Sequence, residues 1–296
     1  MSSKIKVHIY AFITVLIWGA AFPFTRLIGD QISAYGLSFI RCFLAAVVLI
    51  IIGKACGIRK PFRKKDLLWF FLSGILGFSA YFIFFNMGLA TLTSATGSII
   101  TSVSPILSSI AVCKIYKEKI NIIGWVSILC AFIGVMILIM WNGVVSINTG
   151  IFWMVCTAVV FAAYTVLNRK FSDMGYTAME IVTYSAIFGA IQMLVFLPQA
   201  VSDIASADMP ACLSAVYLGV MSSGIAYFLW SKALVITEQT SIVTNYLFIN
   251  PLIAAIIGFI VLREVPDMGT YIGGAIIIIS VVVFSLKGSP EDIDGE

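Results

Sequence analysis

The sequence predicts an all-α membrane protein of ten transmembrane helices, arranged as two five-helix inverted repeats. Three observations lead to this prediction: a strongly apolar composition, ten apolar runs of membrane-spanning length, and one stretch of sequence that occurs twice. Hydrophobic residues make up 61% of the 296 residues and charged residues only 11%, with a mean hydropathy of +1.07. Because soluble domains carry about 25% charged residues, this chain is expected to lie in a lipid bilayer.

A transmembrane helix needs about 20 mainly apolar residues, and ten runs meet this requirement. The first run, 8–25, could pass for a signal peptide, but it lacks an A-x-A cleavage site and is expected to remain as the first span. The other nine runs cover 34–52, 67–89, 94–115, 122–141, 150–167, 178–197, 212–231, 240–262 and 268–286. They are too long and too continuously apolar for β-strands. The polar, acidic tail 288–296 is expected to be disordered.

The Lys and Arg residues predict the orientation, since short cytoplasmic loops carry an excess of positive charge. With the N-terminus in the cytoplasm, fifteen of the 18 basic residues lie inside, Arg26 and Arg263 lie outside, and Arg41 lies within the second span. We therefore expect a multi-pass protein of the cell membrane, plasma or inner, with both termini cytoplasmic. The net charge of +4 indicates no nucleic-acid partner, because the basic residues lie between apolar runs rather than on one face.

The duplication is centred on a proline that precedes a glutamate by thirteen residues, first as Pro105 and Glu118 and again as Pro251 and Glu264. The two copies are 146 residues apart, and a spacing of 143 aligns the first spans of both copies. Further pairs are Tyr81 with Tyr227, Ser127 with Gly273, Gly134 with Ser280, Trp18 with Phe161, and Arg26 with Arg169. This pattern predicts two repeats, residues 1–146 with spans one to five and residues 147–287 with spans six to ten.

Because each repeat holds five spans, an odd number, the second repeat must cross the membrane in the opposite sense to the first. Inverted repeats of this kind are typical of secondary transporters, which bind solute near the midplane between the repeats. Rocking of one repeat against the other would then expose the site to each side of the membrane in turn.

The chain resembles the EamA-type family of the drug/metabolite transporter superfamily. The resemblance rests on residues 81–85, 93–95, Pro105 and Glu118 in the first half, on 227–230, 240–241, Pro251 and Glu264 in the second half, and on Trp18-Gly19 and Phe22-Pro23 in the first span. It implies ten spans in two inverted repeats and transport, without ATP, of small metabolites that are often amino acids or drugs. We therefore expect a secondary transporter of a small amphipathic metabolite, amino-acid-like or drug-like, with export favoured.

Other functions receive less support from the sequence. It contains no Walker-type G-x-x-x-x-G-K-[S/T], no H-E-x-x-H and no G-x-S-x-G, and His8 is the only histidine. The six cysteines lack metal-ligand spacing and are expected to be free thiols. We expect no enzymatic activity, no cofactor and no metal, and the expected partners are a small solute and membrane lipid. A lipid or lipid-precursor flippase that uses the same cavity remains the alternative, and a non-transporting receptor or scaffold is a third class.

Polar residues gather in spans four and nine, where Pro105 and Pro251 are expected to interrupt the helices. Freed backbone groups in lipid must find partners, so such breaks occur where they line protein or a water-filled cavity. Ser98, Thr101, Asn245 and Asn250 are therefore candidates for the lining of a substrate cavity. The competing interpretation is helix–helix packing through small residues and hydrogen bonds. Gly269-x-x-x-Gly273 in span ten equally fits packing within a monomer or a homodimer contact.

Aromatic side chains in spans one, three, six and eight are candidates for the cavity wall, together with one deep amide. They are Trp18, Tyr81, Phe85, Tyr164, Tyr227, Trp230 and Asn86. The alternative is that these rings face lipid or the interface.

Charged residues inside the spans are few. Arg41 lies about seven residues into span two, where a charge costs about 2.5–3.5 kcal/mol on insertion scales. It either anchors a substrate carboxylate or bonds carbonyls and neighbouring helices. Glu118 and Glu264 are expected to fix a loop or gate rather than bind substrate. Glu180 is the only acid expected inside a span, and its shallow position favours a facilitated or weakly coupled exchanger over proton antiport.

Overall fold

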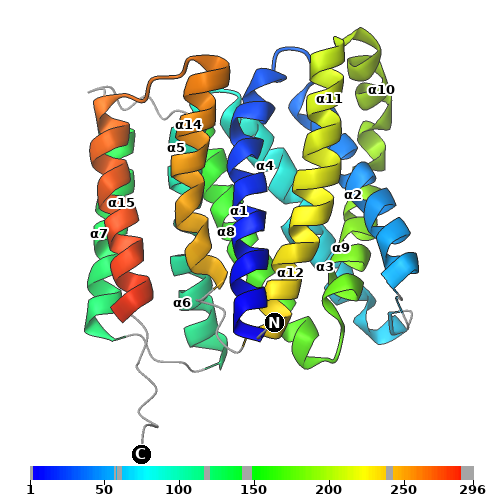
Figure 1. The fold of residues 1–296 in the computed structure, drawn as a ribbon, viewed down its shortest axis with the longest axis horizontal. Coiled ribbons are helices and arrows are strands. Elements are labelled where there is room, and N and C mark those ends of the chain that lie inside the picture. Colours follow the sequence, from blue (N-terminus) through cyan, green and yellow to red (C-terminus); the bar gives the residue numbers. More distant parts are fainter. Residues whose placement is uncertain are drawn as a thin grey trace, which may run out of the picture.

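A computed structural model describes residues 3–56, 58, 62–116, 121–141, 149–237 and 243–287, and these residues contain helices and no strand. Within them, six helical stretches are long and apolar enough to cross a membrane: Ile5–Leu27, Ala34–Ala55, Lys64–Leu89, Thr149–Asp173, Ala178–Ser206 and Met209–Ile236. Three shorter apolar helices cover Ile122–Gly134, Tyr246–Leu262 and Met268–Phe284. These helices lie side by side in one bundle (Figure 1). The prediction of an all-helical, multi-pass membrane protein is therefore confirmed.

The first part of the chain forms α1 (Ser3–Leu27), α2 (Ala34–Cys56), the short η1 (Lys64–Asp66), α3 (Leu67–Gly74), the π-helical η2 (Ile75–Ser79), α4 (Ala80–Leu89), α5 (Ser94–Thr101), α6 (Ser104–Tyr116) and α7 (Ile122–Met140). The second part forms α8 (Thr149–Asp173), α9 (Ala178–Met193), η3 (Leu194–Phe196), α10 (Leu197–Ser206), α11 (Met209–Tyr217), the π-helical η4 (Leu218–Ile225), α12 (Ala226–Ile236), the 3₁₀ segment η5 (Asn245–Ile249), α14 (Asn250–Leu262) and α15 (Met268–Lys287).

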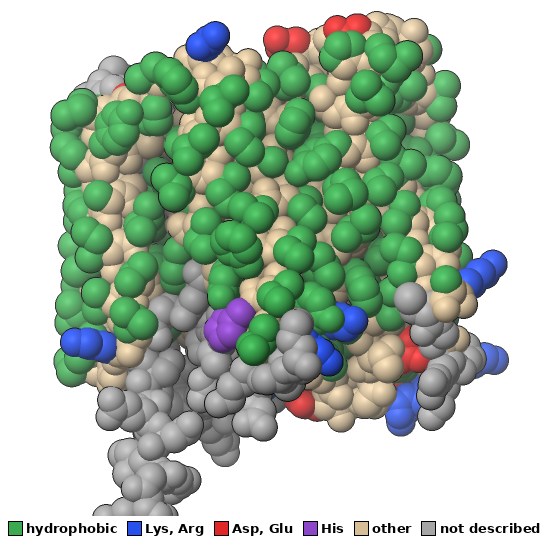
Figure 2. All heavy atoms as spheres, in the orientation of Figure 1, with side chains coloured by type: hydrophobic (Ala, Val, Ile, Leu, Met, Phe, Trp, Pro, Cys, Tyr) green, Lys and Arg blue, Asp and Glu red, His purple; other side chains and the backbone are tan. Residues whose placement is uncertain are grey.

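Contacts between these helices follow a reciprocal pattern. Helix α1 packs on α12 and α14, while α8, in the corresponding place of the second part, packs on α4 and α6. Helices α2 and α9 pack on each other, and so do α7 and α15, which form one edge of the bundle (Figure 1). Hydrophobic side chains cover the middle of the visible face, and Lys and Arg side chains gather mainly at the end where α1 begins (Figure 2).

Helix interruptions occur at matching positions in the two parts of the chain. Helix α5 ends at Thr101 and α6 starts at Ser104, just before Pro105. The 3₁₀ segment η5 ends at Ile249 and α14 starts at Asn250, just before Pro251. Proline is tolerated there because the first residues of a helix have no intrahelical acceptor for their N–H groups. Each proline thus begins a new half-helix.

Two π-helical segments also match. The spacing of 146 that relates the prolines places Ile75–Ser79 on the second half of Leu218–Ile225. Hydropathy carries no signal for a π turn, a feature that is frequent at functional sites. Helices α8 and α9–α10 also run beyond the apolar runs 150–167 and 178–197, to Asp173 and Ser206, because a helix can continue past the apolar stretch that crosses the bilayer.

Glycine allows α7 and α15 to approach closely within one chain. A Cβ atom at Gly134 would lie 2.8 Å from the backbone oxygen of Gly273 and 3.2 Å from the backbone nitrogen of Ile277. Gly273 therefore serves packing within the monomer. Ser127, which aligns with Gly273 in the repeat, is buried. Ser280, which aligns with Gly134, donates a hydrogen bond of 2.7 Å to Ile276 O of its own helix.

We predict that Gly134→Ala lowers the free energy of unfolding by about 1–3 kcal/mol, because the added methyl group must push two backbones apart. Ser280→Ala is the matched control, since it removes only a hydroxyl that bonds its own helix. Thermal unfolding in detergent micelles measures both. Equal melting temperatures for the two variants would contradict the close contact of α7 with α15.

Candidate functional site

A cavity lined by both polar and apolar side chains lies beside the helix interruptions. Its free volume of about 30 Å³ has room for roughly two water molecules. The wall is formed by Trp18, Ala21, Phe22, Arg41, Tyr81, Phe85, Thr101, Ser102, Ser104, Thr157, Phe161, Ser222, Leu247 and Asn250. Six residues proposed from the sequence are in this wall: Trp18, Arg41, Tyr81, Phe85, Thr101 and Asn250. Their part in binding stays a prediction.

Arg41, on α2, is the charged residue of the wall and is only 2% exposed. Its Nε donates to Ser223 Oγ at 3.1 Å, while Nη1 and Nη2 reach Asn86 Oδ1 and Ser222 Oγ at longer distances of 3.4 Å. The guanidinium carbon lies 4.1 Å from the centre of the Phe82 ring and 5.2 Å from that of Phe85. All these partners are neutral.

The π-helical segment η4 supplies two of the hydroxyls that hold Arg41. Ser223 Oγ donates to Leu218 O, five residues earlier, at 2.8 Å. Trp18 Nε1 donates to Ser222 O at 2.9 Å, which ties α1 to the same segment. The wider turn therefore provides both backbone acceptors and side-chain hydroxyls beside the cavity.

Asn86 is a buried residue of α4 that lies behind the wall. Its Nδ2 donates to Ser38 Oγ at 3.0 Å and to Ala34 O at 3.2 Å, both on α2. These two bonds leave Oδ1 to face the guanidinium of Arg41. Asn86 therefore orients Arg41 rather than lining the cavity.

An aromatic cluster surrounds Trp18. The centre of its ring system lies 5.0 Å from that of Trp230, 5.3 Å from that of Tyr227 and 5.4 Å from that of Phe161. Trp230, Tyr227 and Tyr164 are at most 1% exposed and lie behind the wall rather than in it. Ser98 is likewise buried outside the wall, and its hydroxyl bonds Ala95 O of its own helix at 2.7 Å. These four predicted residues support the wall from a second layer.

Asn250 begins α14 and is 6% exposed. Its Oδ1 is buried and has no hydrogen-bond partner among the residues that the structure describes. The repeat partner Ser104 also lines the cavity, but its hydroxyl is bonded to Thr101 O at 2.6 Å. The side chain of Asn245 and all of Glu118 lie outside the described parts of the chain.

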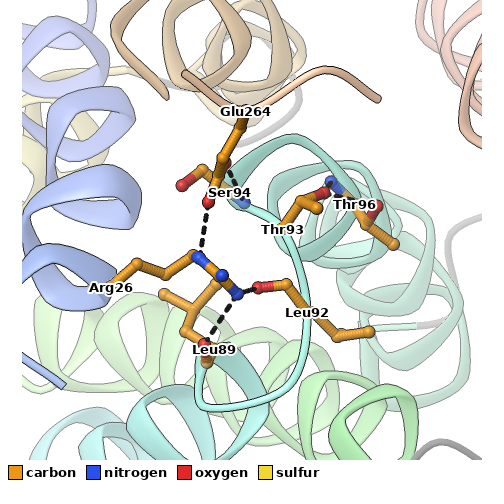
Figure 3. A network of polar contacts seen from close by, with 7 residues as sticks. All are labelled: Arg26, Leu89, Leu92, Thr93, Ser94, Thr96 and Glu264. Carbon is orange, nitrogen blue, oxygen red and sulfur yellow. Dashed lines mark hydrogen bonds and ion pairs between the residues drawn. The ribbon is translucent and has the colours of Figure 1, made fainter. Parts of the chain in front are cut away.

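The end of the bundle predicted to face outward is held by an ion pair. Glu264 Oε1 lies 2.5 Å from Arg26 Nε, and its Oε2 accepts from Ser94 N, the first residue of α5, at 2.9 Å. Arg26 Nη1 in turn donates to the backbone oxygens of Leu89 and Leu92 (Figure 3). This latch joins the end of α1, the turn between α4 and α5, and the end of α14. The sequence placed Glu264 near Arg263 but did not pair it with Arg26.

The carboxylate of Glu180 is engaged in a capping box rather than free inside a span. Thr177 N donates to Glu180 Oε2 at 2.9 Å, and Glu180 N donates to Thr177 Oγ1 at 3.3 Å. Its role is to begin α9. Among the described residues no group of His, Cys, Asp and Glu is arranged to hold a metal ion.

Sequence reasoning missed the wall residues Ser222, Thr157 and Phe161 and the positioning residue Ser223 as candidates. Phe161 aligns with Trp18 in the repeat, so the duplication carried a signal for it. Ser222 and Ser223 depend on the π turn, for which the sequence had no signal.

A cavity bordered by interrupted helices from both parts of a helical membrane protein is typical of solute transporters. The chain belongs to the EamA-like transporter family, whose model matches residues 5–140 and 148–286. This finding confirms the resemblance noted from the sequence motifs.

Several relatives are similar over nearly the whole chain. A probable terminal-alkyne amino-acid exporter of Streptantibioticus cattleyicolor is 28% identical, over 96% of this chain and 95% of that protein. The S-adenosylmethionine uptake transporter of Rickettsia prowazekii is 27% identical, over 92% of this chain and 89% of that protein. A solved crystal structure shares the fold with a TM-score of 0.64 at 18% identity, over 95% of this chain and 97% of the other.

We predict that Glu264→Gln loosens the latch, because the neutral amide loses the ion pair with Arg26. A loss of about 1.4 kcal/mol corresponds to a tenfold larger open population. The measurement is labelling of Phe22→Cys by a membrane-impermeant maleimide in a cysteine-free background. Phe22 lies one turn before Arg26 and lines the cavity.

Asp267→Asn is the control for this variant. Asp267 is also at the end predicted to face outward but caps α15, where its Oδ1 accepts from Thr270 N at 2.7 Å. Labelling that rises equally in both variants, or in neither, would show that the latch does not close the cavity.

Proposed function

We propose that the protein is a secondary transporter that carries a small amphipathic metabolite through the central cavity by alternating access. In this proposal ten helices form two inverted repeats, residues 1–146 and 147–287, and both termini face the cytoplasm at the cell membrane. The observation that carries the proposal is the cavity itself, which is bordered by helix interruptions that recur 146 residues apart. A site between inverted repeats is reached from either side when one repeat rocks against the other.

Three further observations support this function. The family model matches two consecutive regions of similar length. The packing of α1 on α12 and α14 is mirrored by that of α8 on α4 and α6. The latch ties α1, the turn between α4 and α5, and α14 together at the predicted outer end, an arrangement that fits a state closed on that side. Export is favoured as the direction, in line with the name of the Streptantibioticus cattleyicolor relative.

Energy coupling is proposed to be weak or absent. Proton-driven transporters usually bury a titratable carboxylate or histidine in the membrane. The cavity wall contains neither in the described residues, and Glu180 is committed to a helix cap. A facilitated carrier or exchanger fits this wall better than a proton antiporter. No observation in the described residues favours a lipid flippase.

Transport assays in proteoliposomes test the function. We predict that a metabolite panel contains at least one solute that moves faster than through empty vesicles, and that Tyr81→Ala slows this flux about tenfold or more, an effect of about 1.4 kcal/mol. Tyr81 lines the cavity, whereas Tyr271 on α15 is 55% exposed on the outside of the bundle. Tyr271→Ala therefore removes an identical side chain away from the cavity and should transport normally.

Two outcomes would overturn the proposal. One is that no solute of the panel moves. The other is that both tyrosine variants, each shown to be folded, transport as well as the unmodified protein.

A further inference from the structure

The charge of Arg41 is not neutralised by any residue in the described parts of the chain. Its hydrogen-bond acceptors are two serine hydroxyls and an amide oxygen. The two ion pairs of the described residues involve other arginines, Arg26 with Glu264 and Arg63 with Asp66. Among the described residues, no Asp or Glu is in the cavity wall. Buried charges in membranes are usually paired. An unpaired arginine beside a cavity is therefore best explained by a negatively charged ligand that binds and dissociates.

The donors of Arg41 are also incompletely used. A guanidinium carries five N–H groups. The structure shows three hydrogen bonds, of which only the bond from Nε to Ser223, at 3.1 Å, is of ordinary length. The bonds of the two terminal nitrogens, each 3.4 Å long, lie beyond the usual range. These two nitrogens form the fork that binds a carboxylate through both of its oxygens.

The cavity wall also contains a buried group that lacks a hydrogen-bond donor within the described parts of the chain. Asn250 Oδ1 is a buried acceptor without a donor among the described residues. Leaving such a group unpaired is unfavourable, because it has lost its hydrogen bonds to water without replacing them. An N–H or O–H group of a ligand would satisfy it. The two unfilled groups come from α2 and α14, which belong to opposite parts of the chain.

We propose that the cavity binds a carboxylate-bearing solute at two poles, with the carboxylate on Arg41 and an N–H donor of the solute on Asn250 Oδ1. This inference rests on the proposed transport function and names the substrate class of the same site. The aromatic wall of Trp18, Tyr81 and Phe161 covers the apolar part of the solute. The described wall carries a positive side chain and no negative one, so it binds anions and zwitterions and rejects cations.

Arg41 also joins α2, α4 and η4, which would explain its hydrogen bonds without any solute. The two roles make different predictions. A purely structural arginine affects stability alike for every solute, whereas an anchor affects only those solutes that carry a carboxylate. The test therefore varies the solute as well as the protein.

The experiment measures binding by the shift in melting temperature of the purified protein and transport by proteoliposome uptake. Probes are matched sets built on alanine, leucine and phenylalanine: the amino acid, the acid without the amine, and the amine without the acid. We expect binding in the order amino acid, acid, amine, with the amine at least tenfold weaker than the amino acid, because hydrogen bonds to charged groups contribute about 1.5–3 kcal/mol each.

Two variants separate the poles. Arg41→Gln should remove the difference between acid and amine, with about 10- to 100-fold weaker binding of the amino acid. Asn250→Ser, which places at 250 the residue found at its repeat position 104, should keep the preference for acids and remove the advantage of the amino acid over the plain acid. Arg63→Gln is the control, because Arg63 pairs with Asp66 away from the cavity wall. Should Arg41→Gln fail to fold, the solute series on the unmodified protein and on Asn250→Ser still decides the question.

Results that overturn this inference differ from those that overturn the transport function. If amines or neutral solutes of the wider panel bind and move while the carboxylates do not, the two-pole site is wrong and the transporter proposal stands. If no solute of any charge moves, the transport function fails and this inference fails with it.

Discussion

The structure depends on one constraint: backbone polar groups in a bilayer must find hydrogen-bond partners inside the protein. An uninterrupted helix satisfies this rule by itself, and an interrupted one satisfies it only where neighbouring groups supply partners. Here the interruptions before Ser104 and Asn250 and the π turn of Leu218–Ile225 all border the same cavity. These three irregular segments therefore lie where hydroxyl and amide groups are available as hydrogen-bond partners.

Electrostatics adds a second level of organisation. The ion pair of Arg26 with Glu264 lies at the end of the bundle, where both side chains are partly exposed and the pair can form and break at moderate cost. Arg41 lies deeper, surrounded by neutral acceptors and two phenylalanine rings. One arginine thus has its counter-ion in the protein, and the other lacks one among the described residues. Arg26 is therefore suited to holding the end of the bundle together, and Arg41 is suited to binding an anionic ligand.

Much of this organisation could be predicted from the sequence. The apolar composition predicted the helical bundle, and the repeated proline predicted the positions at which spans four and nine are interrupted. Residue type alone could not separate the wall from the layer behind it, because Tyr81 lines the cavity while Tyr164 and Tyr227, of the same residue type, are buried behind it. The partner of Glu264 was missed because Arg26 lies 238 residues away in the chain. The capping box of Glu180 was a local Thr-x-x-Glu signal that could have been recognised.

The small volume of the cavity matters for how well the membrane blocks the passage of ions. Roughly two waters span far less than the hydrocarbon core of about 30 Å, so this cavity by itself is no continuous aqueous path for protons and small ions across the bilayer.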